Sequence, residues 1–119
     1  MDIRVKTFVA EACLRIGAVV EGLGFTGPEV DEDRHDIYPR AMRVRYHRAD
    51  VSIQTRLILS FAGEDHVDTE LAWSAEIPHE VRRVRVGRHT AHTGHQMRRA
   101  LDRQAQAIPD LLGTENPTG

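Results

Sequence analysis

The chain has 119 residues, of which 40% are hydrophobic and 29% are charged, and its formal net charge is −2. This size allows one domain around one core, and the composition is that of a globular protein, which excludes a disordered chain. The near-neutral charge excludes a globally basic nucleic-acid binder, and no apolar run approaches the ~18 residues that span a bilayer.

The N-terminal segment is predicted to be a helix. Apolar residues recur at three- and four-residue steps between Val5 and Leu23, which draws one apolar stripe. "GLGF" ends it, because Gly24 can take the left-handed conformation past the last turn and Phe25 can fold back onto the helix. Residues 26–39 are polar, acidic and bracketed by prolines, so we expect a surface loop there.

From residue 41 onward the period of the apolar residues changes to two. Apolar side chains alternate with polar or charged ones over four segments, which are residues 41–47, 51–61, 67–73 and 81–88. Short turns separate the first three, and a longer connection precedes the fourth. This alternation is typical of an antiparallel meander that buries one face only.

The last predicted element is a second helix. Thr93 and Gln96 stand at capping-box spacing, and apolar residues between Met97 and Leu112 form a helical stripe that Pro109 is expected to interrupt near its end. The pattern predicts an α+β fold, a two-layer sandwich of helix, four-stranded antiparallel meander and helix, with both helices on one face of the sheet. We expect a single domain over residues 1–113 and a flexible C-terminal tail over residues 114–119.

Cysteine usage and the N-terminus indicate the compartment. The one cysteine, Cys13, cannot form an internal disulfide and lies on the apolar stripe of the first helix. No small-residue cleavage site follows an apolar block near the N-terminus, so we expect no signal peptide. A reducing cytoplasm is therefore the expected location.

Three of the seven histidines fall within seven residues, and these are His89, His92 and His95. A zinc site needs three or four converging ligands, and a loop could gather these three with Asp102 or Glu80 as a fourth. Their spacing of three residues rotates successive side chains by about 60° on a helix, which spreads them apart. The alternative is an exposed strand-to-helix connection. This cluster is the candidate site for a small enzyme or a metal-binding protein.

Charge is segregated along the chain. Residues 21–38 carry six acids and one arginine, residues 40–56 five arginines and one acid, residues 61–80 six acids and no Lys or Arg, and residues 82–103 seven arginines and one acid. Outward residues of neighbouring strands can pair into a cross-strand ladder. It would join Arg56 on the second strand, Asp68 and Glu70 on the third, and Arg83 and Arg85 on the fourth. No acid neighbour is evident for Arg43 and Arg45 on the first strand.

The outward arginines are the candidate partner-binding residues. They are Arg43, Arg45, Arg56, Arg83 and Arg85. An acidic protein partner could pair with them in bidentate fashion. Nucleic acid fits less well, because the outward positions hold almost no aromatic side chains for base stacking. A solvated face on which the charges only pair with one another is the alternative.

Three segments together resemble a group of small bacterial proteins. "VEGLGF…GPEV" follows an amphipathic helix, "VRYHRADVSIQTRLILSFAGEDHVDTEL" spans the strands, and "RRALDRQAQAIPDLLG" closes the chain. This arrangement resembles actinobacterial-type α/β proteins of the immunity and antitoxin-partner kind. The resemblance implies a binding protein without active-site chemistry and supplies no site residues.

We therefore expect a non-enzymatic, cytoplasmic protein-binding module with no catalytic residues and no cofactor. No Gly-x-Ser-x-Gly turn, His-Glu-x-x-His motif or phosphate-binding loop is present. The alternative is a small enzyme or a metal-binding protein, in which zinc is held by the histidine cluster. A homodimer through an edge strand or through the open sheet face is compatible with either.

Overall fold

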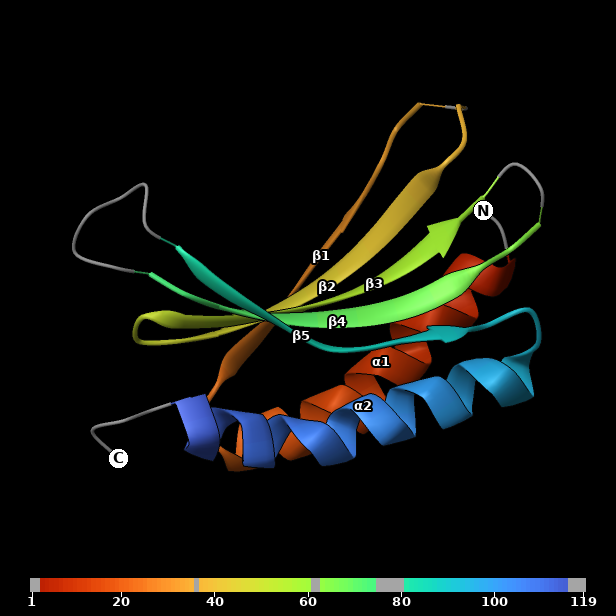
Figure 1. Cartoon of the computed structure of the whole chain (residues 1–119). Helices are drawn as coiled ribbons and strands as arrows, with labels where there is room; N and C mark the ends of the chain where they lie inside the picture. The colour runs from red at the N-terminus through yellow and green to blue at the C-terminus, as the bar shows by residue number, and fades with distance from the viewer. Residues whose placement is uncertain (1–2, 36, 61–62, 75–80, 116–119) are drawn as a thin grey trace.

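A computed structural model describes residues 3–35, 37–60, 63–74 and 81–115, and it orders them as helix, five strands and helix (Figure 1). The elements are α1 (Ile3–Gly22), β1 (Thr26–Glu32), β2 (Arg40–Arg48), β3 (Val51–Leu59), β4 (His66–Trp73), β5 (Arg82–Thr90) and α2 (Gly94–Glu115). The strands form one antiparallel sheet in the order β1-β2-β3-β4-β5. The α+β class is confirmed, with five strands in place of four.

The two helices precede and follow the sheet in the chain and lie side by side beneath it (Figure 1). One continuous core joins both helices to the inward side chains of β2, β3 and β4. Side chains such as Phe8, Ile53 and Leu57 are fully buried, and each contributes about 1.5–3 kcal/mol of transfer free energy. The opposite side of the sheet, which we call the outer face, is covered by neither of the two described helices.

α1 forms as the apolar spacing predicts. Its buried residues lie on one stripe, and no described helix is long and apolar enough to cross a membrane. Gly24 has a φ of 87°, and the amide of Phe25 donates to the carbonyl of Val20 over 3.0 Å. The predicted left-handed end of the helix is confirmed.

The expectation of a loop over residues 26–39 is wrong in its first half, because Thr26–Glu32 forms β1 at the edge of the sheet. Six of the seven β1 residues are exposed, so neither face of this strand needs an apolar alternation. Pro28 is tolerated there because an edge strand leaves half of its amides without a ladder partner. β1 forms by pairing with β2, and that pairing places Glu29 opposite Arg45 and Asp31 opposite Arg43.

α2 begins with the predicted cap. The Thr93 hydroxyl accepts the Gln96 amide over 3.1 Å, and the Gln96 side chain accepts the His92 amide over 2.9 Å. The expected interruption at Pro109 is wrong, since the helix runs on through this residue to Glu115. The helix thus extends two residues into the predicted tail, and residues 116–119 lie outside the described part of the chain.

Among the described residues Tyr46 is the largest fully buried side chain, and its hydroxyl forms no well-aligned hydrogen bond and has the thiol of Cys13 as its polar neighbour. Burial is the main cause that raises the pKa of this phenol. A Cβ added at Gly17 would lie 2.7 Å from the hydroxyl, so glycine is needed where α1 crosses β2.

Replacing Tyr46 with phenylalanine is expected to raise the free energy of unfolding by about 1 kcal/mol. The change keeps the ring and removes a buried hydroxyl whose polar neighbour is the Cys13 thiol, a weak hydrogen-bonding group that offsets little of a desolvation cost of about 1–3 kcal/mol. Urea unfolding of the wild type and Tyr46→Phe at pH 7 measures this difference. A loss of stability would show that the hydroxyl has an effective hydrogen-bond partner, such as the Cys13 thiol.

Candidate functional site

The outer face of the sheet is a ladder of charged side chains. In one cross-strand row Asp31, Arg43, Arg56, Asp68 and Arg88 are register neighbours from β1 to β5. Opposite charges on adjacent strands stabilise such a sheet by roughly 0.2–1 kcal/mol per pair. The row carries three arginines and two aspartates, so it retains positive charge at the β5 end.

Arg56 and Asp68 form the buried centre of this ladder. Nε of Arg56 donates to one carboxylate oxygen over 2.9 Å, and Nη2 donates to the other over 2.8 Å. The Asp68 side chain is only 2% exposed, whereas Arg56 is 29% exposed. The hydrogen bond to Asp68 raises the pKa of Arg56. The predicted pairing of Arg56 with Asp68 is therefore confirmed, and it fixes the arginine in place.

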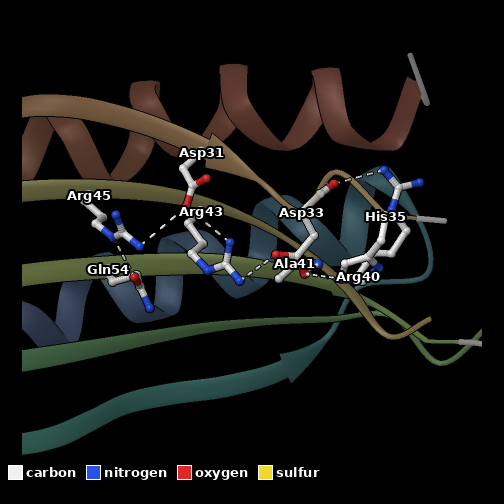
Figure 2. Close-up of polar contacts among 8 residues, drawn as sticks. All are labelled: Asp31, Asp33, His35, Arg40, Ala41, Arg43, Arg45 and Gln54. Carbon is white, nitrogen blue, oxygen red and sulfur yellow. Dashed lines mark hydrogen bonds and ion pairs between the residues drawn. The ribbon is translucent and has the colours of Figure 1, made fainter. Parts of the chain in front are cut away.

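The β1–β2 side of the outer face is neutralised internally, as Figure 2 shows. Arg43 donates to Asp31 over 3.3 Å and to Asp33 over 2.9 Å. Arg45 donates to Gln54 over 2.7 Å and lies 3.5 Å from Asp31. The expectation that Arg43 and Arg45 lack an acid neighbour is wrong, because Asp31 on β1 lies beside both and Asp33, just after β1, pairs with Arg43.

Two carboxylates hold neighbouring elements together. Asp33 accepts hydrogen bonds at the end of the β1–β2 hairpin, and Glu11 accepts them between α1 and α2. Hydrogen bonds from Arg43 and from the Ala41 amide hold the pKa of Asp33 below its usual range. A hydrogen bond from Arg15 lowers the pKa of Glu11. Arg15 also reaches Asp102 over 2.6 Å, so it ties α1 to α2.

These lowered pKa values predict a loss of stability in acid. A carboxyl whose pKa is lowered by folding stabilises the protein fully at pH values above its unfolded pKa, which is 4.5 for Glu11 and 3.8 for Asp33. This contribution to stability is lost as the pH falls through the lower pKa of the folded state. We expect the urea midpoint to fall between pH 5 and about pH 2. In the double variant Glu11→Gln, Asp33→Asn the fall should be smaller. An equal fall in both proteins would assign the acid sensitivity to other carboxyls.

The β5 side of the outer face has a surplus of arginine. Arg83 donates to Glu70 over 3.2 Å. Arg85 and Arg88 are exposed, and neither forms an ion pair or hydrogen bond with any residue that the structure describes. The predicted ladder is thus confirmed for Arg83, and Arg85 stands outside it.

A hollow of about 230 Å³ lies on the outer face between Arg45 on β2 and Arg83 on β5. Small side chains such as Ser52 and Ala72 leave this space, and Glu70 and Gln54 also line it. A hollow of this size accepts one side chain of another molecule. The arginine at each end is already bonded within the face, Arg45 to Gln54 and Arg83 to Glu70, so the hollow is a polar recess beside the unpaired arginines of β5.

The three clustered histidines are not brought together. His89 lies on β5 and faces α2, whereas His92 precedes α2 and His95 is in its first turn. Among the described residues, no group of three or more His, Cys, Asp or Glu side chains could hold a metal ion. Asp102 instead pairs with Arg15, and Glu80, the other fourth ligand considered, lies outside the described residues.

His89 also has the wrong hydrogen-bond polarity for a metal ligand. A ligating histidine usually donates its second ring N–H to a carboxylate or carbonyl. In this protein Nδ1 of His89 lies 2.9 Å from the amide nitrogen of Gln104, which is a donor. The geometry therefore does not favour zinc at His89, and a metal role for the cluster stays a prediction.

Comparison with known proteins adds no family to this geometry. No protein-family model, no curated protein and no solved structure matches this chain. The site must therefore be interpreted from its own residues.

Proposed function

We propose that this protein is a non-enzymatic module that binds an acidic protein partner through the outer face of its sheet. The observation that carries the proposal is the exposed, unpaired state of Arg85 and Arg88 on β5, where Arg85 is the register neighbour of Glu70, one of the residues that line the hollow. Planar guanidinium groups match carboxylates in bidentate geometry, so unpaired arginines on a fixed strand are ready contacts for Asp and Glu side chains.

The strand holds these arginines in position. Inward residues of β5 such as Val84 and Val86 are partly buried, while Arg85 and Arg88 are exposed. Less backbone freedom is therefore lost on binding than for arginines on a flexible loop. Arg43, Arg45 and Arg56 belong to the same proposed face, where their carboxylate and amide partners fix the side chains that border the contact.

A protein partner is favoured over nucleic acid by the chemistry of this face. Its described outward positions hold no Phe, Tyr or Trp on which a base could stack. Asp31 and Glu70 lie among the arginines, where they would repel a continuous phosphate backbone and could instead meet basic side chains of a protein. A cytoplasmic role of the immunity or antitoxin kind is one form that such a module would take.

Affinity capture of the tagged protein from lysate of its own host, with and without nuclease, tests this proposal. We expect one protein at near-equal stoichiometry that survives nuclease and is lost with the double variant Arg85→Gln, Arg88→Gln. Arg34→Gln is the matched control, because Arg34 is exposed and lies just beyond β1 at the opposite edge of the sheet. Equal capture by all three proteins, or a partner that disappears with nuclease, would contradict the proposal.

A further inference from the structure

A buried chain of hydrogen bonds runs from the sheet to α2, and Gln104 is its centre. The Gln104 side chain is 1% exposed. Its amide nitrogen lies 2.9 Å from the carbonyl oxygen of Val67, which only accepts, and its oxygen accepts the Thr69 hydroxyl over 2.7 Å. Thr69 in turn lies 2.8 Å from the Thr55 hydroxyl, which must then donate to it. Each bond fixes the direction of the next.

This chain determines the tautomer of His89. The same Gln104 nitrogen lies 2.9 Å from Nδ1 of His89 and can only donate, so Nδ1 accepts. In a neutral imidazole the single proton must then be on Nε2. Nε2 has no partner among the described residues, and it is not one of the fully buried unpaired atoms, so its N–H is open to a ligand.

A pocket of about 230 Å³ lies between β5 and α2 beside this ring. Its lining residues are His89, Thr90, Gln96, Arg99, Ala100 and Arg103. The lining contains no carboxylate, and Arg99 and Arg103 are exposed, with no ion pair or hydrogen bond to the described chain. Two arginines four residues apart on one helix repel each other unless an anion lies between them.

We infer that this pocket binds an oxyanion, a carboxylate or a phosphate, through the guanidinium groups of Arg99 and Arg103 and the Nε2–H of His89. Gln104 is the positioning residue, because it presents the donor form of the imidazole. The pocket lies on the helix side of β5, so this inference is independent of the acidic partner proposed for the outer face. Its volume fits a small anion or the end of one side chain.

Nitrogen-15 spectra of the histidine side chains in the purified full chain test this inference. We expect His89 to show protonated Nε2 and unprotonated Nδ1 in its neutral form. Sodium phosphate and sodium acetate, titrated separately at constant ionic strength, should shift the His89 signals saturably. The anion with the lower Kd shows whether the pocket prefers a phosphate or a carboxylate. The double variant Arg99→Gln, Arg103→Gln should weaken this binding at least tenfold, whereas Arg34→Gln should leave it unchanged.

Two results would overturn the inference. One is a His89 signal that moves no more with phosphate or acetate than with chloride. The other is an equal response in the wild type and the Arg99, Arg103 double variant. Gln104→Glu tests the positioning role separately. A carboxylate at this position would accept a hydrogen bond and draw the imidazole proton to Nδ1, so the nitrogen-15 spectrum of His89 should show the other tautomer. A purely structural role of Gln104 would leave the tautomer unchanged. If that variant does not fold, the arginine variants still decide, since both side chains are on the surface.

Discussion

Arg56→Met is expected to lower the free energy of unfolding by about 3 kcal/mol, with a fall in Tm of roughly 10 °C. The substitution keeps most of the side-chain volume but leaves the Asp68 carboxylate, 2% exposed, without the guanidinium that neutralises it. An unpaired buried charge costs about 3–5 kcal/mol. The lower end applies because Arg56 itself is 29% exposed, so water can reach the vacated position.

The double variant Arg56→Met, Asp68→Leu is the matched control. Removing both charges should restore stability to within about 1 kcal/mol of the wild type, because apolar residues of similar size often replace a buried pair at little cost. Urea unfolding of the three proteins gives the comparison. A loss below about 1 kcal/mol in the single variant would indicate that Arg88, the register neighbour of Asp68 on β5, takes over the charge.

The double variant Arg85→Gln, Arg88→Gln is expected to weaken affinity for the captured partner by about 30- to 100-fold, or roughly 2–3 kcal/mol. Both guanidinium groups are unpaired in the free protein, so their contacts with carboxylates add to binding without breaking an internal ion pair. Thermal unfolding should be unchanged, because neither side chain stabilises the fold through an ion pair. Calorimetric titration with the purified partner measures the affinity.

Arg43→Gln provides the contrast on the same face. Arg43 already pairs with Asp31 and Asp33, so its removal should lower stability and change affinity by less than about fivefold. If Arg43→Gln instead abolished binding and the β5 variant did not, the contact would centre on the β1–β2 side. Higher salt should weaken binding of the wild type more than that of the β5 variant.

Periodicity was sufficient to predict six of the seven elements, because each buries an apolar stripe or alternation. β1 escaped prediction because its sequence, TGPEVDE, contains one aliphatic side chain, Val30, and that residue is 48% exposed. A strand at the edge is stabilised by its neighbour's hydrogen bonds, which a local pattern does not record. The predicted interruption of the second helix at Pro109 failed for a related reason. Packing of α2 against α1 and β5 outweighs the local cost of a proline within the helix.

The candidate site was predictable where charges face each other on consecutive strands. Alternation placed Arg56 opposite Asp68, but Arg43 gained its aspartates only through the strand that was missed. One feature of the sequence indicated the Gln104 hydrogen-bond network and was not used in the prediction. Position 104 lies three residues after Leu101 and four before Ile108, inside the buried stripe of α2, where a polar residue needs partners. The sequence could not identify those partners, because β4 and β5 supply them.

Hydrogen–deuterium exchange of the purified complex, compared with the free protein, tests the central claim most directly. If the partner binds across the β5 side of the outer face, amides of Arg82–Thr90 and the adjoining part of β4 should exchange more slowly in the complex. Amides of Thr26–Glu32 at the opposite edge should be unaffected. Protection confined to β1, or to the outer surface of α1, with no change on β5, would contradict the account.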